Sequence, residues 1–257
     1  MGLTLRSVGR RAAADSGFEG AAFRTAALAG NPNVGKSTVF NGLTGLHQHT
    51  GNWSGKTVLS AAGTYQYGGR TYRLVDIPGA YSLRAGSAEE EAARDAIALG
   101  GADLVITVCD AGALERNLNL TLQILEVTPN VIVAVNLLDE AEKRGIRVDL
   151  EALSRRLGVP VVGMAARRGR GLEDLRRAVA DFTPREYAYT VKYGEAIERE
   201  LNGLELRLEN LLDGRLNPRF AALKLLEGDG DLLAAVKASL GLDLAEHPEI
   251  KPFLRPP

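Results

Sequence analysis

The sequence predicts an α/β fold, a doubly wound sheet of mainly parallel strands, followed by a small all-α domain. Three observations predict it. Up to about residue 183, apolar and β-branched runs of strand length alternate with helical stretches, and a glycine-rich segment joins the first strand to the first helix. Beyond residue 184 the β-branched runs vanish and apolar residues recur at helical spacing. Alternating strands and helices indicate such a sheet, whose ligand crevice lies at the carboxyl ends of its strands.

The expected strands are apolar runs bounded by polar or glycine residues. Gly68 and Gly69 separate two of them and indicate a hairpin, while β-branched runs near the middle of the chain are typical of central parallel strands. In chain order, strands are expected over residues 25–29, 57–67, 70–76, 104–109, 131–135 and 160–162. Helices are expected over residues 36–43 and 172–182.

The chain divides into three segments. Residues 1–22 show no clear periodicity and are expected to form a flexible extension, residues 23–183 the α/β domain, and residues 184–257 the helical domain. One helical stripe recurs at spacings of four, three, four and three. It consists of Ile197, Leu201, Leu204, Leu208 and Leu211.

Capping signals divide the rest of the helical domain. Asn217 followed by Pro218 is typical of a helix start, and Gly228 suits the end of that helix. Asp229 or Asp231 can cap a further helix that stops near Gly241. These short amphipathic helices are expected to pack as a small bundle.

Composition narrows the function classes. Of 257 residues, 45% are hydrophobic and 25% charged, and the formal net charge is -1. This balance supplies no basic field, so no nucleic-acid partner is expected. A single cysteine, Cys109, sits in an expected buried strand and fits a reducing cytoplasm. No run approaches eighteen apolar residues, so no membrane span is expected.

The segment from Gly30 to Ser37 matches the phosphate-binding loop (P-loop) pattern and lies between a strand and a helix. Glycines let the backbone amides face a polyphosphate, and the helix N-terminus adds a favourable dipole. Lys36 is expected to reach the β- and γ-phosphates, and the Ser37 hydroxyl to bind Mg²⁺. The predicted phosphate contacts are Gly30, Asn31, Pro32, Asn33, Val34, Gly35, Lys36, Ser37 and Thr38.

Two further segments are expected to complete the phosphate end, the part of the site that binds the phosphates and Mg²⁺. Asp76-Ile77-Pro78-Gly79 follows a strand, where Asp76 is expected to hold Mg²⁺ and the Gly79 N–H to sense the γ-phosphate. Alone, this pattern is also a common turn. The glycine-rich residues 47–57 are expected to form a mobile switch loop whose Thr57 completes the Mg²⁺ coordination.

The nucleotide base is expected to bind at the ends of the strands that follow in the chain. Asn136-Leu137-Leu138-Asp139 ends a strand, and the Asp139 carboxylate can accept from both the N1–H and the N2–H₂ of guanine. Adenine offers no such pair, which gives discrimination on the order of 10⁴-fold. Ala165 and Ala166 occupy the base-supporting loop, with the Ala166 N–H expected at the guanine O6. The serine found there in many such domains is absent, so faster nucleotide release is expected.

Other clusters have plainer interpretations. His47 and His49 could suggest a metal site, but they lack nearby carboxylates or thiolates and are expected to be exposed loop residues. The acidic run 89–91 is interpreted as the start of a helix rather than a metal site. The basic run 167–170 is interpreted as a solvated loop rather than an RNA contact.

With these motifs in place, the chain resembles the cytosolic N-terminal part of the FeoB family of bacterial ferrous iron transporters. The specific likeness covers about residues 24–245. It lies in residues 30–33, 51–55, 76–83 and 114–118, with a helical tail over 222–229 that resembles the family's guanine-nucleotide-dissociation-inhibitor-like (GDI-like) domain. The resemblance implies a membrane transport domain following this fragment, Fe²⁺ transport, and a cytoplasmic location at the inner membrane face. The N-terminal residues and Ala165 depart from the usual pattern.

The resemblance also bears on mechanism. Ala80 follows Gly79 where many regulatory G domains place a water-orienting glutamine, so slow intrinsic turnover is expected. Asn33 resembles the K⁺-binding asparagine of K⁺-activated G domains, which implies K⁺-stimulated hydrolysis of GTP to GDP. The expected catalytic residues are therefore Asn33, Lys36, Thr57 and Gly79.

Two alternatives and the assembly state stay open. One alternative is an RNA- or ribosome-associated GTPase, although residues 185–257 lack a Gly-x-x-Gly clamp or a basic–aromatic pattern. The other is a GTP-binding scaffold that scarcely hydrolyses. A homo-oligomer remains compatible with the sequence.

Overall fold

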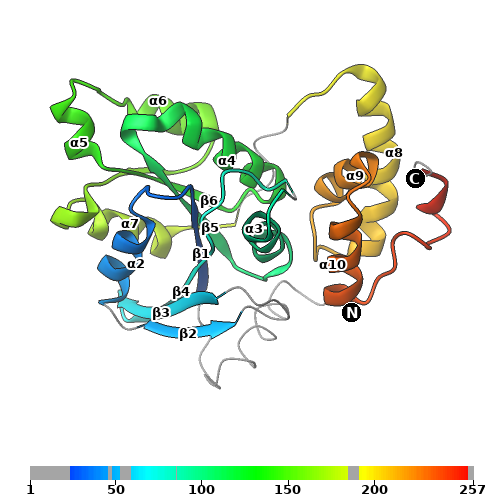
Figure 1. Cartoon of the computed structure of the whole chain (residues 1–257), viewed down its shortest axis with the longest axis horizontal. Coiled ribbons are helices and arrows are strands. Elements are labelled where there is room, and N and C mark those ends of the chain that lie inside the picture. The colour runs from blue at the N-terminus through cyan, green and yellow to red at the C-terminus, as the bar shows by residue number, and fades with distance from the viewer. Residues whose placement is uncertain (1–23, 46–47, 53–58, 85, 185–190, 254–257) are drawn as a thin grey trace.

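The computed structural model describes residues 24–45, 48–52, 59–84, 86–184 and 191–253. An α/β domain and a helical domain lie side by side (Figure 1). The N-terminal extension predicted for residues 1–22 and the switch residue Thr57 lie outside the described residues.

A seven-stranded sheet forms the centre of the α/β domain, in the order β2-β3-β4-β1-β5-β6-β7. Strands β4, β1, β5, β6 and β7 run parallel, while β2 and β3 add an antiparallel edge. The strands are β1 (Arg24–Gly30), β2 (Gln48–Asn52), β3 (Leu59–Tyr67), β4 (Arg70–Asp76), β5 (Leu104–Asp110), β6 (Val131–Asn136) and β7 (Val161–Gly163). The predicted doubly wound sheet is therefore confirmed.

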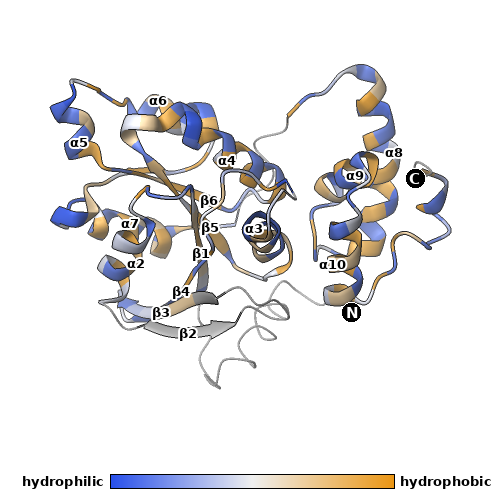
Figure 2. Cartoon of the chain, in the orientation of Figure 1, coloured by the Kyte–Doolittle hydropathy of each residue, from blue (hydrophilic) through white to orange (hydrophobic). Residues whose placement is uncertain are grey.

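Alternating side chains of the central strands fill two cores, one on each face of the sheet. In β1, Ala26 and Leu28 pack toward α2 and α7, whereas Ala27 and Ala29 pack toward α3 and α4. Figure 2 shows these apolar strands between helices whose outer faces are hydrophilic. The helices of this domain are α2 (Lys36–Thr44), α3 (Ala88–Leu99), α4 (Leu114–Val127), α5 (Leu138–Lys143), α6 (Leu150–Leu157) and α7 (Leu172–Asp181).

The prediction of a loop throughout residues 47–57 is wrong for residues 48–52. These residues form the edge strand β2, whose backbone pairs with β3 from Gln48 opposite Gly63 to Asn52 opposite Leu59. An edge strand needs only backbone hydrogen bonds on one side, so its sequence need not alternate between apolar and polar residues. That is why the glycine-rich composition pointed to a loop.

The helical domain consists of α8 (Glu195–Leu212), α9 (Pro218–Glu227) and α10 (Gly230–Leu240). The predicted caps are confirmed. Asn217 Oδ1 accepts from the amides of Arg219 and Phe220 at 2.8 and 3.1 Å, and Asp229 Oδ1 accepts from the Leu232 amide at 3.0 Å. Gly228 ends α9 in the left-handed conformation at φ 73°.

The stripe on α8 differs from the prediction at both ends. Leu201, Leu204 and Leu208 are fully buried as predicted, but at the C-terminal end Leu212 is fully buried, whereas Leu211 is only partly buried. Ile197 is 44% exposed, because the first turn of α8 extends past the helices against which the stripe packs. The buried stripe thus begins one turn later.

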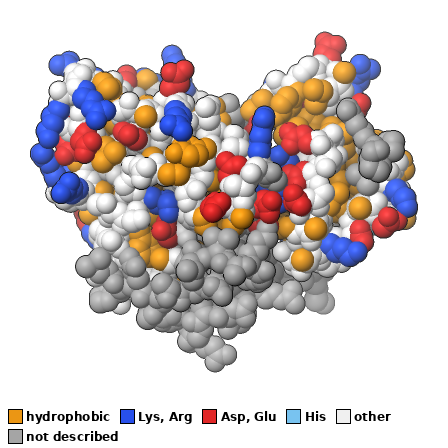
Figure 3. Space-filling model, in the orientation of Figure 1, with side chains coloured by type: hydrophobic (Ala, Val, Ile, Leu, Met, Phe, Trp, Pro, Cys, Tyr) orange, Lys and Arg blue, Asp and Glu red, His pale blue; other side chains and the backbone are white. Residues whose placement is uncertain are grey.

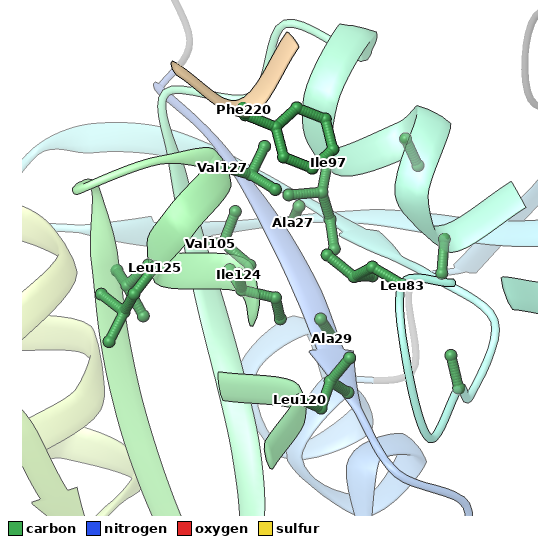
Figure 4. Packing of buried hydrophobic residues seen from close by; sticks show 14 of the residues in the cluster. Ala27, Ala29, Leu83, Ile97, Val105, Leu120, Ile124, Leu125, Val127 and Phe220 are labelled. Atoms are coloured by element: carbon green, nitrogen blue, oxygen red, sulfur yellow. The ribbon is translucent and has the colours of Figure 1, made fainter. Parts of the chain in front are cut away.

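The two domains share one hydrophobic core. Phe220 of α9 lies beside Ile97 of α3 and Val127 of α4 (Figure 4). On the face shown in Figure 3, basic and acidic side chains are interspersed over both domains. None of the helices in the described ranges is both long and apolar enough to cross a bilayer.

A buried ion pair joins the domains next to this core. Arg94 of α3 is fully buried, and its Nη1 donates to Asp229 Oδ1 and Oδ2 at 3.1 and 3.0 Å. Its Nε donates to Asp95 Oδ1 at 3.0 Å. Because Asp229 also caps α10, one carboxylate connects α3 to the start of a helical-domain helix.

Candidate nucleotide-binding site

The predicted phosphate-binding loop connects the end of β1 to α2. Gly35 has φ 82° and Asn33 has φ 67°, both in the left-handed region. A Cβ at Gly35 would collide with the Asn136 amide nitrogen, so this position needs glycine for space as well as for conformation. Asn33, Ser37 and Thr38 are exposed at the mouth of the loop. The loop therefore opens the α2 N-terminus toward solvent, as a phosphate site requires.

Lys36 and Asp76 form the centre of the phosphate end. Lys36 Nζ is paired with Asp76 Oδ1 and donates to the Ile77 carbonyl at 2.6 Å. Burial raises the pKa of Asp76, and the Lys36 charge opposes that rise. Ser37 contributes a hydroxyl and Asp76 a carboxylate, which are hard oxygen ligands of the kind Mg²⁺ prefers.

The segment after Asp76 lies against the phosphate-binding loop. The Ile77 amide donates to the Leu28 carbonyl at 2.9 Å, and the Ala80 amide donates to the Gly30 carbonyl at 3.3 Å. A Cβ at Gly79 would lie 3.4 Å from the Pro32 nitrogen. Ala80 is 4% exposed, so its side chain belongs to the core and does not face the phosphate end.

Asn136 joins the phosphate end to the base end. Its side chain is buried, its Nδ2 donates to the Val34 carbonyl at 3.0 Å, and its Oδ1 accepts from the Ala166 amide at 3.0 Å. The Ala166 amide, predicted to contact the guanine O6, thus donates to Asn136 in this structure, and its contact with the base stays a prediction. Sequence reasoning placed Asn136 at the base and missed this bridging role.

Leu137 directs the chain from the end of β6 into α5. It has φ 62°, a conformation that costs a bulky residue strain and that is concentrated at functional sites. Asp139 follows in the first turn of α5 with its side chain 19% exposed. Its carboxylate pairs with Arg168, whose Nε lies 2.9 Å from Asp139 Oδ2. The basic run was interpreted as a solvated loop, and this partner of Asp139 was missed.

The base-supporting loop is braced without the absent serine. Ala165 is 1% exposed, and its amide donates to the Arg170 carbonyl at 3.1 Å. Gly171 must stay glycine, because it has φ 82° and a Cβ there would strike the Gly163 carbonyl. Backbone contacts and Asn136 thus hold the loop.

Ala165→Ser is expected to slow GDP release about fivefold, the equivalent of one added hydrogen bond near 1 kcal/mol within the loop. Displacement of a fluorescent GDP analogue measures the rate. An unchanged dissociation rate would contradict this role for position 165.

The remaining candidates have structural roles where they are described. The acidic run 89–91 lies in the first turn of α3, capped by Ser87, and no group of three His, Cys, Asp or Glu in the described ranges could hold a metal ion. Cys109 is buried, and burial raises its pKa to about 11. The side chains of His47 and His49 lie outside the described residues.

A phosphate-binding loop, an Asp-x-x-Gly segment and an Asn-x-x-Asp segment at the strand ends of a doubly wound sheet define a P-loop GTPase domain. Residues 24–179 match the family model of ferrous iron transport protein B, and residues 193–254 match that of the FeoB cytosolic helical domain. The chain belongs to the FeoB family, as its motifs predict.

The chain is similar to several characterised relatives. It is 43% identical over 209 residues to the Fe(2+) transporter FeoB of Escherichia coli K12, and this match covers 80% of this chain and 27% of that protein. It matches the cytosolic domain of the T. maritima FeoB iron transporter in a GDP form, with a TM-score of 0.75 and 41% identity, over 90% of this chain and 91% of that one. The GMPPNP form of that domain matches with a TM-score of 0.73 and 40% identity, over 89% of this chain and 90% of that one. The chain thus spans about a quarter of the length of the curated relatives that it matches.

Proposed function

We propose that this chain binds GTP and hydrolyses it to GDP and phosphate. The observation that carries the proposal is the bridge made by Asn136, which holds the phosphate-binding loop and the base-supporting loop together at the carboxyl edge of the sheet. The GDP and GMPPNP forms of the T. maritima domain support a guanine nucleotide as ligand. Release of phosphate from GTP, compared with ATP, tests the proposal.

The proposed mechanism relies on the backbone and on one lysine. Lys36 exchanges Asp76 and the Ile77 carbonyl for the β- and γ-phosphates, while the loop amides face the same oxygens. The Gly79 N–H senses the γ-phosphate. Because the Ala80 side chain is buried, backbone groups of the switch segments position the attacking water.

Two cations fit this site. Ser37, Asp76 and Thr57 would hold Mg²⁺, which would supply positive charge against the phosphates. K⁺ bound at Asn33 would supply positive charge where many GTPases use an arginine finger. Asn33 suits that role because it is exposed at the loop mouth and is held there in a left-handed conformation.

GTP hydrolysis is expected to be at least about tenfold faster in KCl than in NaCl. This stimulation should be smaller than the 10³- to 10⁵-fold acceleration that an arginine finger contributes. Asn33→Ala is expected to remove this difference while GDP binding persists. Phosphate release at matched ionic strength measures both effects. Equal rates in the two salts, or stimulation that survives in Asn33→Ala, would contradict the role of Asn33.

We further propose that the nucleotide state reaches the helical domain through the segment after Gly79. Side chains of α4 hold that segment: the Arg116 guanidinium lies 4.5 Å from the Tyr81 ring centre, and Gln123 Oε1 accepts from the Leu83 amide at 2.7 Å. Helix α3 follows and carries Arg94, which is paired with Asp229 of the helical domain. A movement of Gly79 would therefore be transmitted to the start of α10.

In the intact protein, this movement would act on a membrane transport domain that follows the helical domain. The identity to ferrous iron transporters supports Fe²⁺ as the transported ion and the cytoplasmic face of the inner membrane as the location. A GTP-binding scaffold with little turnover is the second candidate, favoured by the buried Ala80. The K⁺-dependent turnover assay separates the two. An RNA- or ribosome-associated GTPase has no support from the family matches.

A further inference from the structure

The carboxylate predicted to recognise guanine is already paired within the chain. Asp139 lies in the first turn of α5, and Arg168 lies on the short turn Ala166–Arg168 of the base-supporting loop. Arg168 Nε is 2.9 Å from Asp139 Oδ2, with side chains 62% and 19% exposed. The pair thus connects the two segments that would hold the base.

The guanidinium and guanine offer Asp139 the same chemistry. Each presents planar N–H donors that a carboxylate accepts side by side. Arg168 occupies Oδ2, one of the two carboxylate oxygens that would accept from the N1–H and N2–H₂ of guanine, so the guanidinium and the base would crowd the same edge of Asp139. We propose that Arg168 is an internal competitor for Asp139 that slows the association of guanine nucleotides. This inference rests on the proposed role of Asp139 in base recognition.

The size of the effect follows from the exposure of the pair. Because Arg168 is largely in solvent, the pair resembles a surface ion pair rather than a buried one, and breaking it costs little. The expected slowing of association is therefore about 1.5- to 5-fold. It should also diminish in high salt, because the Debye length falls to about 3 Å at 1 M.

The chain contains a matched control in the same loop. Arg170 Nη1 lies 3.0 Å from Glu142 Oε1, with side chains 56% and 53% exposed. Arg170→Gln therefore removes the same charge from the same loop and breaks a similar pair, but it leaves Asp139 untouched. Any general loss of attraction for the phosphates appears in both variants.

Stopped-flow association of a fluorescent GDP analogue tests the proposal in the wild type, Arg168→Gln and Arg170→Gln. Arg168→Gln is expected to associate about 1.5- to 5-fold faster than Arg170→Gln at low salt, with the difference largely lost at 1 M KCl. Equal or slower association of Arg168→Gln would overturn it. If the wild type binds no GDP, the proposed function is wrong as well. If the wild type binds GDP but the two variants associate at equal rates, only the proposed competition by Arg168 is wrong.

A second background isolates Asp139. In Asp139→Asn the side chain has no charge to pair with Arg168, and its amide can donate to the carbonyl at position 2 of xanthine. Association of xanthosine diphosphate with Asp139→Asn is then expected to be unaffected by Arg168→Gln. An acceleration as large as that seen with GDP would show that Arg168 acts elsewhere and would overturn the proposal.

Discussion

Asp139→Ala is expected to weaken GDP binding by about 10⁴-fold and to abolish the preference for guanine over adenine nucleotides. A site built to accept both guanine donors loses that much when the pairing is lost. The variant should fold, because the Asp139 side chain contacts the largely exposed Arg168 at the domain surface. Equilibrium titration with fluorescent GDP and ADP analogues measures both quantities.

Glu142→Ala is the control for this prediction. Glu142 lies on the same helix, and its exposed carboxylate pairs with Arg170 of the same loop. Removing it changes the net charge equally but should change GDP affinity less than about threefold, the range of an exposed pair. Similar losses in both variants, or a guanine preference that survives in Asp139→Ala, would exclude Asp139 as the selective group.

Arg94→Ala is expected to destabilise the chain by about 3–5 kcal/mol. Removing one partner of a buried ion pair leaves charge that is poorly compensated, and here two carboxylates, Asp95 and Asp229, lose the same guanidinium, while Asp229 keeps only Lys224 at 3.9 Å. Since Asp229 lies in the helical domain, the loss should weaken the contact between the domains most. Urea unfolding, followed by circular dichroism, gives the change in free energy of unfolding.

Arg155→Ala provides the comparison. Arg155 pairs with Glu151 at 3.7 Å on the outside of α6, with side chains 70% and 91% exposed. That substitution should cost less than about 0.5 kcal/mol. A cost below about 1 kcal/mol for Arg94→Ala would mean that the pair with Asp229 does not hold the domains together.

Local patterns predicted most of the fold. The strands 70–76, 104–109 and 131–135 appear in the structure with ends shifted by at most one residue. A strand between two layers of helices can be recognised from its own apolar and β-branched residues, without knowing which strand pairs with it. The polar edge strand β2 could not be recognised this way. Its pairing with β3 depends on backbone groups and not on side-chain pattern.

The motifs of the site were predicted one by one, but the hydrogen bonds and ion pairs that connect them were not. Asn136 was assigned to the base, whereas its side chain links Val34 to Ala166 across three segments distant in sequence. Arg168 and Arg94 were likewise missed, because their partners lie 29 and 135 residues away. Periodicity and spacing report which residues share an element, not which charges meet when elements pack.

Isothermal titration calorimetry of the purified chain with GTP and ATP, each with Mg²⁺, tests the central claim most directly. The geometry of the phosphate-binding loop and of Asp139 predicts binding of GTP at least about 10³-fold tighter than binding of ATP. Equal affinities for the two nucleotides, or no heat from either, would contradict it.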